Sequence, residues 1–294
     1  MKAKTIFATI TWVIIAFMLV SCTQSFLGSN NDAYTPSKYT ILVASNDMEV
    51  GMPRIPFIVK DGQSTATEIA QISLAAINIT KAPFDVVWEG GATNFSDYTV
   101  PYWVFYPEID VAGKYGVQAT LLLEGGETVQ HQFVITIQED AVAPAVGEAG
   151  FPSESRIAVD ATSISKISSD FQNPDPDFYK LSLAEALNNG RPTIISFSTP
   201  AFCTTAFCAP VLETMKEIKR EHIDFDYVHI EIFDDFETLT LHQTINEWQL
   251  QSEPWTYILN ADGIVAARFG GPVSPAELKS HLHSISSPKI DRNE

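Results

Sequence analysis

The sequence predicts two folded domains, an all-β sandwich followed by an α/β domain. Between residues 39 and 138, short alternating apolar segments are separated by Asp-Gly and Gly-Gly turns, a pattern typical of antiparallel strands. Between residues 178 and 288, strand-like runs alternate with capped helical segments, which is typical of a small mixed sheet covered on both faces. A length of 294 residues accommodates both domains.

The composition restricts the classes of partner. The net charge is −18, from 36 acidic and 18 basic residues. A chain of this charge is repelled by phosphates, so neither a nucleic-acid partner nor attachment to anionic lipid through basic residues is expected. Hydrophobic residues make up 45% of the chain, which is too many for general disorder.

The N-terminus has the features of an export signal. Lys2 and Lys4 precede an apolar run from Ile6 to Val20, shorter than the roughly 20 residues that span a bilayer. The run ends in Leu-Val-Ser-Cys22, which resembles the lipobox of bacterial lipoproteins. The resemblance implies a signal peptide over 1–22, a lipid on Cys22 that anchors the chain to a membrane, and a localisation in the cell envelope. An uncleaved signal anchor is the alternative, and it also places the chain outside the cytoplasm.

The next segments predict a tether and a sandwich. Residues 23–38 are polar and rich in Ser and Asn, as in a flexible tether. Residues 39–138 carry the strand-like segments YTILVA, RIPFIVKDG, AQISLAAINIT, YWVFYPE, KYGVQATLLLEGGE and TVQHQFVITIQ. The last two look like the closing strands of an immunoglobulin-like module.

A linker and an α/β domain are predicted to follow. Residues 139–177 are rich in Pro, Ala and Ser and lack periodicity, so we interpret them as an interdomain linker. After it, the sequence predicts a capped helix at 182–190, a strand at 192–198, a helix at 211–222, a strand at 224–233, a long helix at 237–250, a hairpin at 255–271 and a final helix from Ser274.

This order, with Cys203 and Cys208 where the first strand meets a helix, resembles the thioredoxin fold. The motif Ser-Glu-Pro254-Trp-Thr, like the family's cis-proline loop, and the hairpin followed by VSPAELKSHL support the resemblance, which covers 178–288 and leaves 289–294 as a tail. It implies that Cys203 and Cys208 exchange disulfides and that Pro254, preceded by a cis bond, lies against the sulfurs.

The sequence departs from the family in three respects. Four residues separate the cysteines instead of two, Phe202 replaces the usual Trp, and the strand before the pair lacks the usual buried acid. His229 and Glu231 are candidates for moving the proton in its place. If the helix begins near Cys208, Pro210 lies in its first turn, Cys208 gains the helix dipole and Cys203 lies further out in the loop. If it begins near Thr204 or Thr205, Cys203 gains the helix dipole, as in the family, and we favour Cys203 as the nucleophile.

Three functions remain open. The first is thiol–disulfide exchange by a membrane-tethered protein, without a cofactor, on exported protein thiols or with a membrane redox partner. The second is copper binding or delivery through Cys203, Cys208 and His229, because two thiolates and an imidazole suit Cu(I). The third is a non-enzymatic lipoprotein in which the pair is a structural disulfide. The sequence names neither the substrate nor the electron donor.

Overall fold

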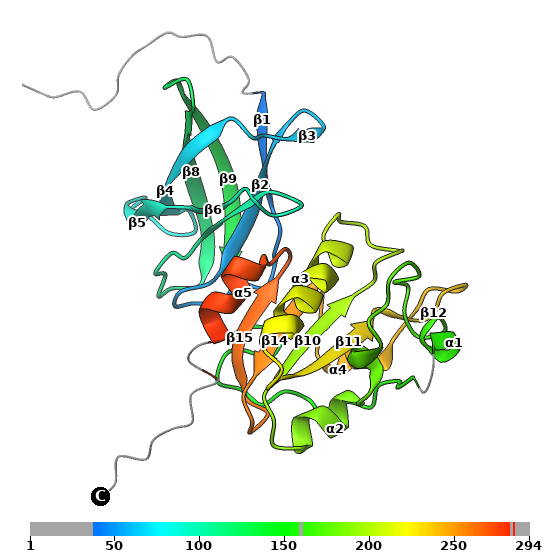
Figure 1. The fold of residues 1–294 in the computed structure, drawn as a ribbon. Coiled ribbons are helices and arrows are strands. Elements are labelled where there is room, and N and C mark those ends of the chain that lie inside the picture. Colours follow the sequence, from blue (N-terminus) through cyan, green and yellow to red (C-terminus); the bar gives the residue numbers. More distant parts are fainter. Residues whose placement is uncertain (1–37, 159–160, 283–284, 286–294) are drawn as a thin grey trace, which may run out of the picture. The chain divides into compact units, whose positions relative to one another are not determined.

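Strands β1 to β9 form two antiparallel sheets (Figure 1). The computed structural model describes residues 38–158, 161–282 and 285; the predicted signal peptide with Cys22, nearly all of the tether and the tail lie outside the described residues. The strands are β1 (Tyr39–Val43), β2 (Ile55–Asp61), β3 (Ser64–Thr65), β4 (Ile69–Asn78), β5 (Val86–Gly91), β6 (Thr93–Phe95), β7 (Tyr102–Phe105), β8 (Gly113–Leu123) and β9 (Thr128–Ile137). One sheet has the order β1-β2-β7-β6, with β3 paired to β2, and the other has the order β5-β4-β8-β9.

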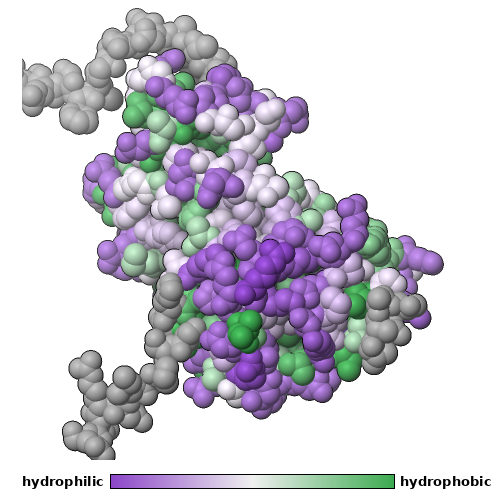
Figure 2. Space-filling model, in the orientation of Figure 1, coloured by the Kyte–Doolittle hydropathy of each residue, from purple (hydrophilic) through white to green (hydrophobic). Residues whose placement is uncertain are grey.

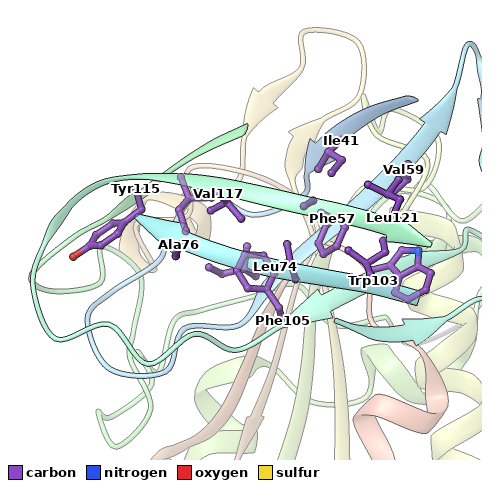
Figure 3. Packing of buried hydrophobic residues seen from close by; sticks show 14 of the residues in the cluster. Ile41, Phe57, Val59, Leu74, Ala76, Trp103, Phe105, Tyr115, Val117 and Leu121 are labelled. Carbon is purple, nitrogen blue, oxygen red and sulfur yellow. The ribbon is translucent and has the colours of Figure 1, made fainter. Parts of the chain in front are cut away.

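Side chains from both sheets share one hydrophobic core (Figure 3). Phe57 and Phe105 come from one sheet, Leu74 and Val117 from the other, and all four are buried. Along β8 buried and more exposed residues alternate, because successive side chains of a strand point to opposite faces. Burial of each large apolar side chain contributes roughly 1.5–3 kcal/mol. The prediction of an all-β sandwich is confirmed.

The second half of the chain is an α/β region around a four-stranded sheet. Its elements are α1 (Ala161–Ile164), the 3-10 helix η1 (Pro176–Tyr179), α2 (Leu183–Asn188), β10 (Thr193–Ser198), α3 (Cys208–Glu221), β11 (Asp226–Glu231), β12 (Phe233–Asp235), β13 (Thr240–Leu241), α4 (Gln243–Glu247), β14 (Trp255–Leu259), β15 (Val265–Gly270) and α5 (Pro275–Leu282). The sheet order is β11-β10-β14-β15, with β10 parallel to β11 and antiparallel to β14. This is the mixed sheet that the thioredoxin-like prediction requires.

Helices cover both faces of this sheet because the side chains of β10 alternate between them. Ile194 belongs to a core that includes Val211 of α3 and Leu278 of α5. The next residue, Ile195, belongs to a second core that includes Leu183 of α2 and part of α4. All residues of β10 are buried, which explains why the strand reads as an apolar run in the sequence.

The prediction of a long helix over 237–250 is wrong for the first half of that segment. There β13 pairs with β12, which precedes the segment, in a small hairpin, and α4 covers only Gln243–Glu247. The Asp235 carboxylate accepts hydrogen bonds from the backbone N–H groups of Glu237 (3.0 Å) and Thr238 (2.6 Å), which closes a turn where a helix would otherwise start. His242 then caps α4 through its side chain.

The segment predicted as a linker has contacts with the α/β region along its length. Ala149 forms a β-bridge with Ile264, next to β15. Further on, Ile164 is buried in the core that includes residues of α3 and α5. Residues 139–177 therefore follow a packed path where they are described, while the boundaries of the two domains stay a prediction.

Two buried ion pairs join residues of the sandwich to residues of the α/β region within one compact unit. Arg54, before β2, donates from Nε and Nη2 to the carboxylate of Glu277 on α5, at 2.6 and 2.8 Å. The Tyr102 hydroxyl donates to the same carboxylate at 2.5 Å. Arg268 of β15 donates to the carboxylate of Asp47 at 3.0 Å. Buried charges are tolerated when they are paired in this way.

The face of the molecule in Figure 2 is mostly hydrophilic, with apolar side chains in small scattered groups. This agrees with the net charge of −18. Within the part of the chain that the structure describes, no helix is long and apolar enough to cross a membrane. The apolar run from Ile6 to Val20 lies outside that part.

Candidate active site at the cysteine pair

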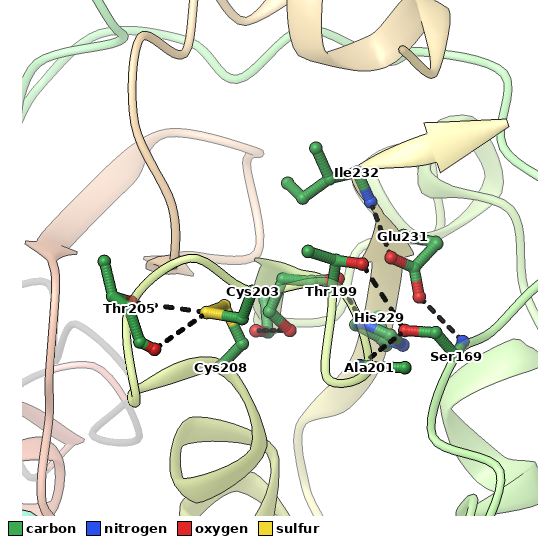
Figure 4. Close-up of a disulfide and its surroundings, with 11 residues drawn as sticks. Ser169, Thr199, Ala201, Cys203, Thr205, Cys208, His229, Glu231 and Ile232 are labelled. Atoms are coloured by element: carbon green, nitrogen blue, oxygen red, sulfur yellow. Dashed lines mark hydrogen bonds between the residues drawn. A yellow bond between two sulfur atoms is a disulfide. The ribbon is translucent and has the colours of Figure 1, made fainter. Parts of the chain in front are cut away.

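Cys203 and Cys208 form a disulfide in the loop between β10 and α3 (Figure 4). Their Cα atoms are 6.1 Å apart, within the range that a disulfide can bridge. The four intervening residues therefore do not prevent closure. The loop places the bond at the same strand-to-helix junction that the sequence predicts.

The two sulfurs have different surroundings. Helix α3 begins at Cys208, so Pro210 lies in the first turn and Cys203 lies outside the helix. The structure thus realises the first of the two helix starts considered above, and the dipole of α3 acts on Cys208. Cys208 is 0% exposed, whereas Cys203 is half-buried. An incoming thiolate can approach Cys203, and Cys208 is the buried partner.

Thr205 lies against the accessible sulfur (Figure 4). Its hydroxyl oxygen is 3.2 Å and its carbonyl oxygen 3.3 Å from Cys203 Sγ. In the disulfide, the sulfur can only accept, so the hydroxyl donates to it. Once the bond is reduced, the same hydroxyl can stabilise a thiolate on Cys203 and the carbonyl can accept from its thiol.

Aromatic side chains hold the two ends of the loop. Phe207, the residue before Cys208, is 6% exposed and belongs to a cluster with Ile58 and Tyr102 of the sandwich. Phe202, the residue before Cys203, stacks on Phe236 with ring centroids 5.5 Å apart. The loop is therefore fixed by packing on each side of the disulfide.

The peptide bond between Glu253 and Pro254 is cis, as the resemblance implies, and this loop brings Glu253 to the sulfurs. A carboxylate oxygen of Glu253 and the sulfurs of Cys203 and Cys208 all lie within 4.8 Å of one another. Within the described residues, Glu253 Oε2 is a buried atom that has no hydrogen-bond partner. The site thus contains an acid on the side of the cis-proline loop.

The surroundings of Glu253 raise the pKa of its carboxyl. Burial raises the pKa of the Glu253 carboxyl, a hydrogen bond with the backbone of Thr204 lowers it, and the charge of Glu231 raises it. The balance places the pKa above the ordinary value of a glutamate. A carboxyl of this kind can give and take a proton closer to neutral pH than an exposed one.

His229 and Glu231, the predicted candidates for proton transfer, are occupied elsewhere. Both ring nitrogens of the buried His229 face partners, the Tyr179 hydroxyl at 2.8 Å and the Ser198 carbonyl at 2.9 Å. Because the carbonyl can only accept, Nε2 carries the proton. The Glu231 carboxylate accepts from the backbone N–H of Ser169 at 2.8 Å, as Figure 4 shows.

The structure does not assemble the predicted copper ligands. Among the described residues, the group of metal-ligand side chains at the pair contains Glu253 and not His229. Metals bind thiolates, and in this form both sulfurs belong to a disulfide, which leaves one carboxylate. We therefore do not assign a metal to the oxidised site.

A groove of about 500 Å³ borders the disulfide loop. Its lining comes from the cysteine loop, from the cis-proline loop and from the sandwich, including Leu42, Ile58, Val100, Phe207 and Glu253. Strand β1, which contributes to it, is an edge strand of its sheet. An edge strand offers unpaired backbone groups to an extended segment.

Comparisons with known proteins identify no family. No family model matches the chain, and no curated protein does. A thiol:disulfide interchange protein of the thioredoxin family from Chlorobium tepidum TLS is 16% identical, with 49% of this chain and 95% of that chain covered and a TM-score of 0.30. CopC from Methylosinus trichosporium OB3b is 16% identical, with 34% and 94% covered and a TM-score of 0.24. Murine CRIg is 9% identical, with 34% and 96% covered and a TM-score of 0.24.

These likenesses are too weak to carry an argument about activity. The fold rests on the sheet topology described above. Three residues at the site have roles that were not predicted from the sequence, namely Glu253, Thr205 and Phe207. Glu253 had a detectable signal, because it precedes the proline of a loop that lies against the sulfurs in the thioredoxin fold. The roles of Thr205 and Phe207 depend on loop geometry and on the sandwich.

Proposed function

We propose that the protein carries out thiol–disulfide exchange through Cys203 and Cys208, outside the cytoplasm. The observation that carries the proposal is a disulfide at the start of α3 in a thioredoxin-like sheet, with one accessible and one buried sulfur. An attacking thiolate would form a mixed disulfide with Cys203. The leaving sulfur would then be Cys208, where the N-terminus of α3 favours negative charge.

The proposed substrates are thiols of exported proteins. The groove beside the disulfide supports this choice, because its apolar lining and the edge of β1 suit an extended polypeptide better than a small charged thiol. The proposed anchor is a lipid on Cys22, which would keep the site at the membrane. A membrane redox partner would then supply or remove electrons.

The reduction potential tests the activity. The full-length protein in detergent micelles is equilibrated with glutathione buffers, and the free thiols of the pair are counted by mass. A potential between about −100 and −250 mV, together with exchange with a cysteine-containing peptide, supports the proposal. A potential below about −300 mV without exchange contradicts it and makes the pair a structural disulfide.

Matched variants assign the sulfurs. Cys208→Ser leaves Cys203 free, so the variant should trap a mixed disulfide with the peptide. Cys203→Ser leaves only the buried Cys208 and should trap little. Equal trapping by both variants would contradict the assignment of Cys203 as the attacked sulfur.

The anchor requires a separate experiment. The mass of the N-terminal peptide from membranes should show a lipid on Cys22, and Cys22→Ser should move the protein out of the membrane fraction without changing the potential of the pair. An unmodified Cys22 in a membrane-bound protein would instead indicate an uncleaved signal anchor.

A further inference from the structure

The cis-proline loop carries an acid next to the disulfide, in a fold whose usual buried acid is missing from the strand before the pair. The strand β10 reads Thr193–Ser198 and contains no carboxylate. Glu253 instead reaches the sulfurs from the cis-proline loop, with one of its oxygens within 4.8 Å of both. Its other notable feature is the buried Oε2, which has no hydrogen-bond partner among the described residues. A buried oxygen without a hydrogen-bond partner destabilises the fold, so its presence next to the sulfurs calls for an explanation.

We propose that Glu253 is the catalytic base and acid of the exchange, which takes the proton from the buried Cys208 and returns it. This inference rests on the proposed function. In the reduced protein, the Cys203 thiolate attacks a substrate disulfide, forming a mixed disulfide and releasing one substrate thiolate. Glu253 then removes the proton from Cys208, whose thiolate attacks Cys203 Sγ.

The bonds and electrons balance in this step. The bond between Cys203 and the substrate sulfur breaks, the bond between Cys203 and Cys208 forms, and the electron pair leaves with the second substrate thiolate. Glu253 gives its proton to that thiolate. Overall the Cys203 thiolate and the Cys208 thiol are oxidised to the disulfide, and the substrate disulfide is reduced to one thiolate and one thiol. In the opposite direction, Glu253 protonates Cys208 as it leaves.

Other groups around the site are less suited to this role. The Glu231 carboxylate is held by the backbone of Ser169, and both nitrogens of His229 face hydrogen-bond partners. Two charged residues are near Glu253. Lys60 lines the same groove, and the negative charge of Glu231 raises the pKa of the Glu253 carboxyl. Burial and this charge both raise the pKa of Glu253, which brings it closer to the pKa of a thiol.

The test follows the two steps separately. The reduced full-length protein is mixed with a disulfide-containing peptide, with a metal chelator present throughout, and samples are quenched with acid and resolved by mass. In Glu253→Gln, the first step should proceed nearly as in the wild type. The second step, in which Cys208 attacks Cys203 and closes the protein disulfide, should be about tenfold or more slower at pH 7. The mixed disulfide on Cys203 should therefore accumulate. Glu127→Gln, in the exposed turn after β8, removes the same charge and should behave as the wild type.

The pH dependence of the closure rate distinguishes a catalytic from a purely structural role of Glu253, because a structural role would not change it. In the wild type, the rate of closure should rise with pH through an apparent pKa above that of an ordinary glutamate, and in Glu253→Gln this rise should disappear. Glu253→Asp should restore part of the rate. If wild type and Glu253→Gln close at equal rates with equal profiles, the inference fails while the proposed function stands.

Two other outcomes are also decisive. If the wild type itself does not exchange, the proposed function fails and the inference fails with it. If Glu253→Gln does not fold, the wild-type profile decides: a closure rate governed only by an ordinary thiol pKa of about 8.5 would overturn the role of Glu253.

Discussion

Arg54 Nε lies 2.6 Å from Glu277 Oε1, and the two side chains are only 9% and 2% exposed. The hydroxyls of Tyr102 and Tyr106 also donate to this carboxylate, at 2.5 and 3.0 Å. Burial opposes ionisation of Glu277, but the charge and hydrogen bonds of Arg54 outweigh it and hold the pKa of the carboxyl below its usual value. Residues far apart in the sequence thus form one fully paired buried site.

Removal of one partner should therefore be strongly destabilising. Glu277→Ala leaves the Arg54 guanidinium buried without a countercharge, and we expect a loss of about 3–5 kcal/mol in the free energy of unfolding. Urea unfolding of the full-length protein in detergent measures it. The double variant Arg54→Met with Glu277→Met should recover most of the loss. Arg191→Ala, which breaks an ion pair with Asp226 in which Arg191 is largely exposed, should cost about 1 kcal/mol or less. Equal losses for both sites would contradict the prediction.

Phe207 should couple the sandwich to the cysteine loop. Phe207→Ala empties a buried place among Ile58 and Tyr102, and we expect a loss of about 3 kcal/mol in stability. The loop should also loosen, so that Cys208 reacts faster with an alkylating reagent after reduction. Phe202→Ala, at a half-buried position, is the control and should cost less. Unchanged reactivity of Cys208 in Phe207→Ala would show that the loop holds its shape without the sandwich.

His229 should make stability depend on pH. Burial lowers the pKa of His229 below the value of 6.5 that it has in the unfolded chain. As the pH falls, the unfolded chain therefore binds a proton at His229 before the folded protein does. The contribution of neutral His229 to the free energy of unfolding is present above pH 6.5 and is lost as the pH falls below it. The slope is at most about 1.4 kcal/mol per pH unit for one proton.

The measurement is urea unfolding between pH 7.5 and 5 in wild type and variants. His229→Asn, whose side chain does not titrate, should lose less of its free energy of unfolding than the wild type as the pH falls. Some loss should remain, because burial also lowers the pKa of His242. His222→Gln, at the half-buried C-cap of α3, removes a histidine from another part of the chain and is the control. An unchanged slope in His229→Asn would refute the prediction.

Thr205 should tune the reactivity of Cys203. Thr205→Val removes the hydroxyl 3.2 Å from Cys203 Sγ and with it a donor to the thiolate. We expect the reduced protein to be alkylated at Cys203 several-fold more slowly at pH 7, because less of the thiol is ionised. The exposed Thr204→Val is the matched control. Faster alkylation in Thr205→Val would mean that the hydroxyl shields the sulfur instead.

Local sequence signals predicted most elements of the fold. The capping box at Ser182 and Glu185 starts α2, and the Asp262-Gly263 turn closes the β14–β15 hairpin, with Gly263 at a φ of 73°. These features act over a few residues, so they can be recognised in the sequence. The helix prediction over 237–250 is wrong at its start because the carboxylate of Asp235 accepts hydrogen bonds from the backbone and the hydroxyl of Thr238. These local bonds form a turn that hydrophobic periodicity does not predict.

The sequence by itself determined the order of a sandwich and an α/β region and the place of the cysteine pair at a strand-to-helix junction, and its resemblance to the thioredoxin fold implied the cis bond before Pro254. Only the tertiary structure decided that Cys203 is the accessible sulfur, that Glu253 and not His229 reaches the pair, and that Arg54 meets Glu277. The physical reason is range: caps, turns and alternation depend on neighbouring residues, whereas burial and the meeting of distant charges depend on how the two halves of the chain pack.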